Sequence, residues 1–526
     1  MKAMTAVGVL AVVGVTLAAD DPPVASTTSG SIRGTALVGG GAAFKGVPFG
    51  QPPVGNLRWR EPQPVPPWAG TRDATSFAPP CAQSGLMRAE LASISSEDCL
   101  YLNVWTPSWP AASGALPVMV WIHGGGNFGG TSNTPALDGE QLARHGVVVV
   151  TTNYRLSILG FLAHPALSKE SPHQVSGNYG LLDQIAALRW VQANIRQFGG
   201  NPGNVTIFGE SAGSFDVSFL MVSPLAKGLF HRAIAQSGAV TTLGNALTLT
   251  QAEQSGAALM ARLNPPADRV LERLREVPPA DLFKIEPPYL TSPPPSLLAT
   301  VDGRVLTEQP SQSFARGREH RVPLMIGSTA RERIPGTTLP TDLAGGIRSA
   351  YGSLASKATT LYDRASHADD PRYGTAAEQW ATDTSFRCSS VLEASWHAAA
   401  HNRTYEYEFD RVPKGREESG ATHASEVPYV FGTFAAARVP AEYGAADQAV
   451  SDTMQRYWTN FARTGDPNGT GLPAWPAFDP SARRHLAFTD AGAIARDALR
   501  REFCDVYIEH VTGPGRNQPG IWVRLR

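Results

Sequence analysis

The chain has few cysteines, almost no net charge and almost no long hydrophobic runs, and each shortage excludes a class of protein. Its 526 residues carry a net charge of −1, so nothing in the composition attracts nucleic acid or an anionic membrane. Beyond the first residues, no apolar run approaches the length of a transmembrane helix. With 42% hydrophobic and 17% charged residues, the composition is typical of a globular protein and not of a disordered one.

The four cysteines are Cys81, Cys99, Cys388 and Cys504. They allow three pairings, and spacing alone cannot choose among these. None lies in a C-x-x-C pair, and an oxidising compartment favours disulfides over metal thiolates. The simplest arrangement closes one short loop, Cys81–Cys99, and one long loop, Cys388–Cys504.

The N-terminus differs from the rest of the chain. Lys2 precedes an apolar stretch from Ala3 to Leu17, and Ala18-Ala19 lead into an acidic pair. This pattern predicts a secretory signal over residues 1–19, because about 15 apolar residues are too few to span a bilayer comfortably. We therefore expect a secreted or periplasmic protein with no membrane span after signal removal. Its oligomeric state cannot be predicted from the sequence.

Buried strands and helices alternate through the central chain. Continuous apolar or β-branched runs at 117–122, 146–151, 205–208 and 322–327 predict strands buried on both faces. Residues 179–198 have apolar positions at helical spacing. This alternation predicts an α/β fold with a mostly parallel sheet and helices on both faces.

The flanking segments are less regular. Short apolar runs between glycines over 30–57 predict antiparallel strands, and the proline-rich 52–67 predicts a loop. Residues 247–310 predict helical and loop insertions that cap the sheet, 405–409 a later strand, and 449–461 a helix. Because no linker or repeat divides the chain, we expect 20–526 to form a single domain.

One serine is placed to act as a nucleophile. Gly209-Glu210-Ser211-Ala212-Gly213 follows the predicted strand 205–208 and precedes an apolar helix-like segment. A glycine on each side permits a cramped strand-to-helix turn that pushes the Ser211 Oγ out of the sheet. The pattern alone is common in a chain with 51 glycines, and its strand–helix context makes it a nucleophile-elbow candidate.

A glycine-rich loop supplies candidate oxyanion donors. His123-Gly124-Gly125-Gly126-Asn127 follows the strand 117–122 directly. Glycines there allow the N–H groups of Gly125 and Gly126, with that of Ala212, to turn toward one point. The alternative of a phosphate-binding loop is disfavoured, because no Gly-Lys-Ser/Thr follows.

These motifs, with others in the same order, resemble the type-B carboxylesterase family, the cholinesterase-like branch of the α/β-hydrolase fold. The further matching blocks are Glu97–Asn103, Asn153–Arg155, Gly177–Gln184, Phe198–Pro202, Pro428–Gly432 and Thr464–Asn468. The resemblance spans most of the mature chain. It implies a serine esterase that needs neither metal nor organic cofactor and acts on small-molecule esters. It also implies the pairs Cys81–Cys99 and Cys388–Cys504.

The resemblance assigns the other catalytic residues. Glu332 occupies the place of the family's acid and His423 that of its base, in the order Ser…acid…His expected of this fold. Arg333 stands where the family usually has glycine, and its Cβ makes a positive φ costly. This arginine either lowers the pKa of Glu332 or points to solvent, and we expect the second.

Specificity is less defined. Residues 81–99 contain no Trp, Tyr or Phe, whereas cholinesterases place a tryptophan in that loop for cation–π binding, which argues against choline esters. Asn127 and Phe128 are candidate substrate contacts, although Asn127 could instead only fill a turn. Asp216 could contact a polar substrate or form hydrogen bonds behind the triad, and we expect the second.

Several alternatives remain open at this point. Residues 160–172 resemble bacterial exported members of the family, among them enzymes that remove tricarballylate esters from fumonisin. Polyacid esters, or amides cleaved with the same triad, are therefore alternative substrates, and a non-catalytic cholinesterase-like binding protein is a remote third. His397 and His401, four apart on a predicted helix, lack a third ligand for a metal and are expected at the surface.

Overall fold

The computed structural model describes residues 21–85, 88–111, 114–242, 244–286, 297–334, 339–367, 372–437 and 441–513. The predicted signal, 1–19, lies outside these ranges, as does 287–296 of the predicted cap. Within these ranges, no helix has both the length and the apolar character needed to cross a membrane.

The core of the fold is an 11-stranded mixed sheet with the order β16-β15-β14-β13-β10-β9-β7-β8-β6-β4-β3. Its central strands run parallel to one another. These parallel strands are β8 (Val148–Thr152), β7 (Leu116–Ile122), β9 (Gly200–Glu210), β10 (Arg232–Gln236), β13 (Leu324–Thr329), β14 (Thr404–Phe409) and β15 (His485–Thr489). The strands predicted from the apolar runs and from 405–409 are confirmed.

Antiparallel strands complete both edges of the sheet. They are β16 (Gly492–Arg496), β6 (Tyr101–Thr106), β4 (Ala42–Pro48) and β3 (Thr35–Ala36). A separate small sheet contains β1 (Val24–Thr27), β2 (Gly30–Arg33) and β5 (Thr71–Asp73). The antiparallel prediction for 30–57 is confirmed up to Pro48, and beyond it lies a loop with one short 3₁₀ turn.

Alternation along β7 shows why both faces of the sheet are apolar. Val118, Val120 and Ile122 belong to one buried cluster, whereas Met119 and Trp121 belong to another. The first face is covered by α5 (Tyr179–Asn194), α6 (Ala212–Val222) and their neighbours. The second is covered by α2 (Glu140–Ala143), α15 (Val427–Phe431) and α16 (Ala445–Thr464). The mostly parallel sheet with helices on both faces is therefore confirmed.

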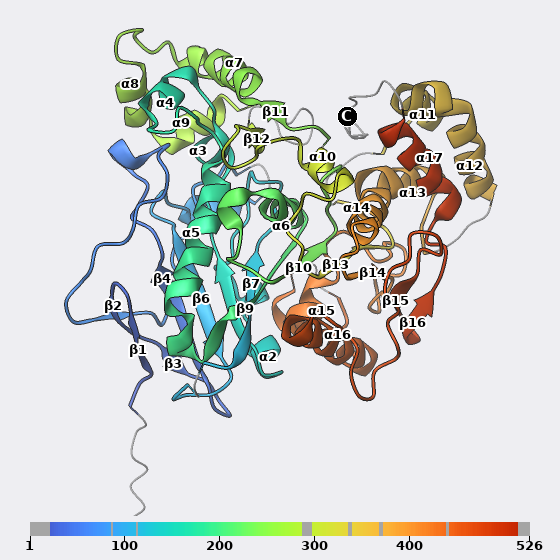
Figure 1. Ribbon diagram of the computed structural model, residues 1–526, viewed down its shortest axis with the longest axis horizontal. Coiled ribbons are helices and arrows are strands. Elements are labelled where there is room, and N and C mark those ends of the chain that lie inside the picture. The colour runs from blue at the N-terminus through green and yellow to red at the C-terminus, as the bar shows by residue number, and fades with distance from the viewer. Residues whose placement is uncertain are drawn as a thin grey trace, which may run out of the picture.

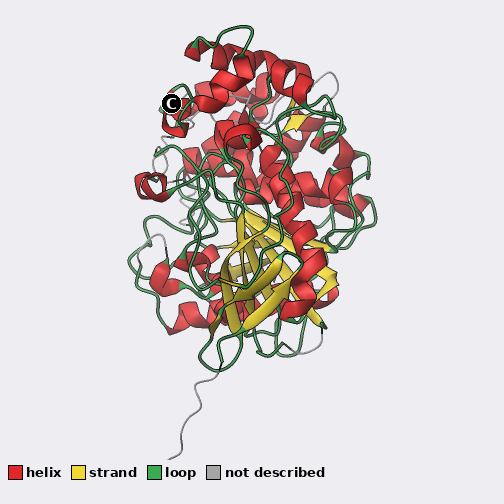
Figure 2. Cartoon of the chain, turned by 90° about the vertical axis from the view of Figure 1, so that its left-hand side faces the viewer, coloured by secondary structure: helices red, strands yellow, loops and turns green. Residues whose placement is uncertain are grey.

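The predicted helices have slightly different bounds in the structure. The segment 179–198 forms α5 and then a 3₁₀ turn, η3 (Ile195–Phe198), and 449–461 lies inside α16. Figure 2 shows the large sheet in the lower half of the molecule and most helices above it.

Two helical groups lie beyond the sheet, at the upper left and upper right of Figure 1. The first contains α3 (Ser157–Phe161), α4 (Pro165–Glu170), α7 (Leu249–Met260), α8 (Val270–Glu276) and α9 (Pro279–Lys284). The second contains α11 (Leu343–Tyr351), α12 (Ala355–His367), α13 (Ala376–Thr382), α14 (Cys388–Ala399) and α17 (Arg501–Thr512). Between them lie α10 (Pro310–Ala315) and the two-residue strands β11 (Leu247–Thr248) and β12 (Thr300–Val301).

Both disulfides implied by the family resemblance are formed. Cys81–Cys99 closes a loop that contains the short helix α1 (Ala89–Ile94), and Cys388–Cys504 joins α14 to α17. No free cysteine occurs among the described residues. The second disulfide lies in a buried cluster with residues of α11 and α12, so this helical group has an apolar core of its own.

Candidate active site

Ser211 lies at a strained turn between β9 and α6. Its φ of 56° and ψ of −120° fall outside the regions that residues with a Cβ prefer. The turn is held from the neighbouring strand, because the Ser211 N–H donates to the carbonyl of Gln236 at 2.9 Å. Ser211 is only partly buried, as expected for a hydroxyl at a nucleophile elbow.

The glycines beside Ser211 are needed for close approach and not for a positive φ. A Cβ on Gly209 would lie 2.6 Å from the Gly213 carbonyl oxygen, and a Cβ on Gly213 would lie 2.0 Å from the Ile122 carbonyl oxygen. Neither glycine has a positive φ, so the backbone strain is confined to Ser211. The sequence predicted a cramped turn, and the structure shows that α6 packs against the end of β7.

The three side chains predicted as nucleophile, base and acid meet in one chain of hydrogen bonds. His423 Nε2 lies 2.9 Å from Ser211 Oγ, and His423 Nδ1 lies 2.5 Å from Glu332 Oε2. Since an ionised carboxylate can only accept, Nδ1 carries a proton, and Nε2 of the neutral ring is free to accept one from the serine. This arrangement can activate a hydroxyl nucleophile.

Acidic side chains around His423 set its protonation. Burial opposes the imidazolium form, but the negative charges of Glu210, Glu332 and Glu426 outweigh burial and raise the pKa of His423 to about 9. Glu210 Oε1 lies 3.1 Å from His423 Nε2. Burial, together with the charges of Glu210 and Glu332, raises the pKa of Glu426 to about 8. The site therefore stabilises a positive charge on the base.

Glu332 follows β13 in a short loop, and the last residue of that strand binds its carboxylate. The Thr329 N–H donates to Glu332 Oε1 at 2.7 Å, which leaves Oε2 for the histidine. Arg333, the departure from the family pattern, has no positive φ, so the expected cost of its Cβ does not arise. Its side chain is 53% exposed and lies 3.7 Å from Glu378, which agrees with the expectation that it points outward.

The glycine-rich loop lies directly against the serine. A Cβ on Gly124 would be 3.0 Å from Ser211 Cβ. Gly125 and Gly126 have φ values of 117° and 66°, which glycine adopts without strain. Ala212 is the first residue of α6, so its N–H has no acceptor within the helix. The loop that carries Gly125 and Gly126 thus contacts Ser211 through Gly124, and Ala212 follows the serine directly.

Asn127 and Phe128, the candidate substrate contacts, are both buried. The Asn127 Nδ2 donates to Asp216 Oδ1 at 3.0 Å, and its Oδ1 accepts from the Tyr154 hydroxyl at 2.9 Å. Asp216 also accepts from Gln184 at 2.5 Å. Burial raises the pKa of Asp216 to about 7 against these hydrogen bonds. These contacts favour structural roles for Asn127 and Asp216, behind the glycine-rich loop.

Sequence reasoning missed four residues of the site. Glu210 and Glu426 stood within the quoted motifs but were given no role, and adjacency to Ser211 was a signal for Glu210. Thr382 accepts from the Glu332 N–H at 3.1 Å, and the Phe386 ring lies 4.7 Å from the His423 ring. No local pattern points to Thr382 or Phe386, because packing alone brings them to the site.

The prediction that His397 lies at the surface is wrong, whereas His401 is exposed as expected. His397 is fully buried, with Nδ1 2.8 Å from Glu319 and Nε2 2.9 Å from the Val322 carbonyl. Burial follows because α14 packs on β13 and β14 and carries this residue inward. In the described parts of the chain, no three His, Cys, Asp or Glu side chains are grouped to hold a metal ion.

Comparisons with known proteins identify the family of this chain. The sequence profile of the Carboxylesterase family matches residues 21–507. Fumonisin B1 esterase of Sphingopyxis macrogoltabida is 40% identical over 481 residues, 88% of this chain and 85% of that protein. Para-nitrobenzyl esterase of Bacillus subtilis is 36% identical over 493 residues, 90% of this chain and 96% of that protein.

The fold is likewise shared. A solved PNB esterase structure has a TM-score of 0.79 and 34% identity, and the match covers 92% of this chain and 99% of that one. The architecture is the α/β-hydrolase fold. Because the similar proteins are esterases, the alternative of a non-catalytic binding protein is no longer kept. The chain belongs to the carboxylesterase family and is a carboxylic ester hydrolase.

Proposed function

We propose that the protein hydrolyses esters through an acyl-enzyme on Ser211, with His423 as general base and acid and Glu332 as the orienting acid. The observation that carries the proposal is the hydrogen-bonded chain from Ser211 Oγ through both ring nitrogens of His423 to Glu332. Each member has the chemistry that its role requires, since the hydroxyl needs a base and the imidazolium needs a negative partner.

In the first half-reaction, Ser211 Oγ bonds to the ester carbonyl carbon as its proton passes to His423 Nε2. The negative charge moves to the carbonyl oxygen, where the N–H groups of Gly125, Gly126 and Ala212 stabilise it by about 3 kcal/mol per donor. The bond to the alcohol oxygen then breaks, and His423 returns its proton to that oxygen. The alcohol leaves, and the acyl group remains on Ser211.

Water completes the cycle. His423 Nε2 takes a proton from water as the hydroxide oxygen bonds to the acyl carbon, and a second oxyanion forms in the same place. When the bond to Ser211 Oγ breaks, His423 returns the proton to the serine and the carboxylic acid leaves. Glu332 stays ionised throughout and stabilises the imidazolium formed in each half. No cofactor takes part in these steps.

The test compares the parent with Ser211→Ala on p-nitrophenyl esters from acetyl to decanoyl. We expect the variant to lose at least about 10⁴-fold in kcat, because removing the nucleophile leaves only binding and oxyanion stabilisation. The parent should release a burst of p-nitrophenol equal to the enzyme concentration. Residual turnover by Ser211→Ala within about tenfold of the parent would contradict the mechanism.

Substrate preference is the finer part of the proposal. The 40% identity to fumonisin B1 esterase supports bulky polyacid esters as a second candidate class. Fumonisin B1 and a p-nitroanilide, assayed beside the ester series, separate polyacid esters and amides from simple esters. A kcat/KM for fumonisin B1 below that of every p-nitrophenyl ester would remove the polyacid candidate.

We also propose that residues 1–19 are removed on export and that 20–526 form one domain. The small-residue site after the apolar run supports removal, and the two disulfides suit an oxidising compartment. A single sheet that takes strands from Thr35 to Arg496 supports one domain. N-terminal sequencing of protein recovered from the culture medium or periplasm tests the export proposal.

A further inference from the structure

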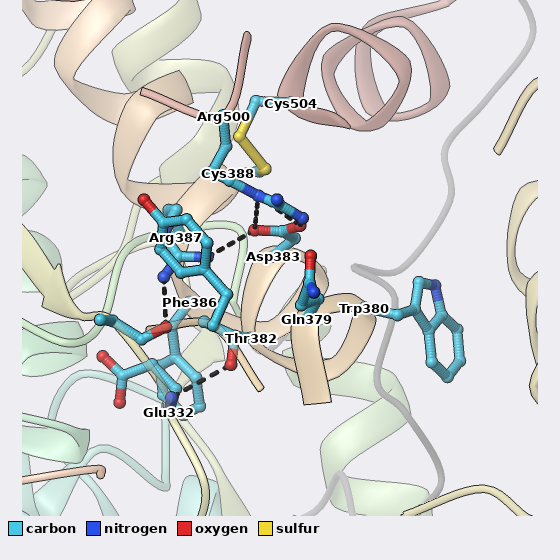
Figure 3. A network of polar contacts seen from close by, with 12 residues as sticks. Glu332, Gln379, Trp380, Thr382, Asp383, Phe386, Arg387, Cys388, Arg500 and Cys504 are labelled. Atoms are coloured by element: carbon cyan, nitrogen blue, oxygen red, sulfur yellow. Dashed lines mark hydrogen bonds and ion pairs between the residues drawn. A yellow bond between two sulfur atoms is a disulfide. The ribbon is translucent and has the colours of Figure 1, made fainter. Parts of the chain in front are cut away.

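A single π-helical turn, η8 (Asp383–Arg387), lies between α13 and α14, directly beside the loop that carries Glu332. Figure 3 shows this turn with Glu332 on one side and the Cys388–Cys504 disulfide on the other. π-Turns are rare inside helices and occur frequently at functional sites. The contacts of this turn with the Glu332 loop and with His423 indicate a role in the candidate active site.

The Glu332 loop begins directly after Thr329, the last residue of β13, and the N–H groups of residues 330–333 all have acceptors. The Thr329 N–H binds the Glu332 carboxylate, and the Ala330 and Arg331 N–H groups bind the carbonyls of Phe409 and Ala421. These partners lie on the side of the sheet and of the His423 loop. These hydrogen bonds fix only the side of the Glu332 loop that faces the sheet and the His423 loop.

The other side of the loop is held by the helices around the π-turn. Thr382 Oγ1 accepts from the Glu332 N–H at 3.1 Å. Arg387 Nη2 donates to the Ala330 carbonyl at 2.6 Å and to the Thr329 carbonyl at 3.4 Å. Figure 3 shows Thr382, at the end of α13, and Arg387, at the end of the π-turn, with their side chains on the same side as Glu332. The three peptide groups that lead from Thr329 to Glu332 are thus fixed in orientation.

The Arg387 guanidinium is itself held rigidly. It is fully buried, with Nη1 2.6 Å from Asp383 and Nη2 3.5 Å from Glu408. Its Cζ lies 4.7 Å from the centre of the Tyr373 ring, a cation–π distance. A buried charge with two carboxylate neighbours and a ring above it has little freedom to move. It can therefore fix the carbonyls that it binds.

The π-turn is also anchored to α17. Asp383 accepts from Arg500 Nη2 at 2.7 Å, and the adjacent residue after the turn, Cys388, is joined to Cys504. At its inner end, the ring of Phe386 packs 4.7 Å from the ring of His423. The same turn therefore contacts the acid loop, the base and a covalently tethered helix.

We propose that the segment Thr382–Arg387 positions Glu332 against His423, with Thr382 and Arg387 as positioning residues that touch neither substrate nor reacting atoms. This inference rests on the proposed catalytic roles of Glu332 and His423. Loss of either hydrogen-bonding side chain lets the carboxylate shift from Nδ1, and displacements of about 1 Å in an active site lower turnover by up to about 100-fold. Substrate binding does not use these residues, so KM stays the same.

The test is Thr382→Val, with Thr384→Val as its matched control. Both threonines are buried in the same segment and lose one hydroxyl, but Thr384 Oγ1 donates at 2.7 Å to Trp380 of its own helix. We expect kcat to fall by about 10–100-fold in Thr382→Val and by less than about twofold in Thr384→Val. Thr382→Ser, which keeps the hydroxyl, should restore most of kcat. The amplitude of the p-nitrophenol burst gives the concentration of active enzyme, by which each rate is divided.

A pH profile separates positioning from loss of packing. Glu210, Glu332 and Glu426 are the negative groups whose charges act on His423, and a displaced Glu332 acts on it more weakly. The acid limb of kcat/KM should therefore move to lower pH in Thr382→Val and stay in place in Thr384→Val. Arg387→Lys, which keeps the buried charge but loses the Nη2 that donates to the two carbonyls, should show the same shift.

The inference is overturned if the kcat losses of Thr382→Val and Thr384→Val differ by less than about threefold, or if the acid limb does not move. Such a result, with Ser211→Ala still inactive, leaves the proposed function intact and removes only the positioning role. An active Ser211→Ala would instead show that the triad itself is wrongly assigned, so the two failures can be told apart.

Discussion

Removing the charge of Glu210 should move the pH dependence of the enzyme in a direction fixed by the structure. Glu210 Oε1 lies 3.1 Å from His423 Nε2, and its charge is the largest of those that raise the pKa of His423 to about 9 against burial. Catalysis needs neutral His423 as the base. In the parent, kcat/KM should therefore rise with pH until about pH 9 and level off above it.

The size of the change follows from this distance. At an effective dielectric constant of about 20, two unit charges at this separation interact by about 5 kcal/mol, which is a ceiling. Charges this close typically shift a pKa by about 1–3 units, or about 1.4–4 kcal/mol. Glu210→Gln keeps the shape and removes the charge. We expect its acid limb to lie about 1–2 pH units below that of the parent.

The assay is kcat/KM for a p-nitrophenyl ester from pH 5 to pH 10, with released phenolate corrected for its own ionisation. Glu426→Gln is the matched control, because the charge of Glu426 contributes less to His423 than that of Glu210 does. Its acid limb should move in the same direction by a smaller amount. An unmoved limb in Glu210→Gln, or a larger shift in Glu426→Gln, would refute the electrostatic reasoning.

Two further substitutions test the packing of the site. Gly213→Ala places a Cβ 2.0 Å from the Ile122 carbonyl oxygen, so α6 must move away from β7. We expect the free energy of unfolding, measured by urea denaturation, to fall by about 1–3 kcal/mol or more, and kcat to fall as well. An unchanged free energy of unfolding would disprove the close approach. Asp216→Ala leaves the amide donors of Asn127 and Gln184 without their acceptor, and we expect a loss of about 2–5 kcal/mol in the same measurement. A loss below about 1 kcal/mol would show that these contacts matter little.

Much of the fold was predictable because it depends on local patterns. Continuous apolar runs can be buried only between two covered faces, and β7, β8, β9 and β13 lie where such runs occur. The bounds of the helix predicted over 179–198 differ in the structure, since α5 ends at Asn194 and a 3₁₀ turn continues to Phe198. The insertion over 247–310 was predicted only as helices and loops, and its two-residue strands have no pattern of their own.

In the candidate site, too, some features follow from local motifs and others depend on contacts between distant residues. The sequence by itself predicted the nucleophile and the glycine-rich loop from their motifs, and the family resemblance predicted the base and the acid. It did not predict that Asn127 would be buried against Asp216, or that His397 would be buried against Glu319. Such contacts join residues that are far apart in the chain, so no periodicity or spacing encodes them.

Only the tertiary structure decided the pKa of His423 and the hydrogen bonds that fix the Glu332 loop. The raised pKa of His423 depends on three carboxylates that belong to different segments, and charge interactions follow distance in space. The hydrogen bonds of Thr382 and Arg387 to the Glu332 loop likewise join residues that are about 50 positions apart in the sequence. The motifs name the groups that we propose to react, whereas packing between distant segments fixes their separation, their orientation and their protonation.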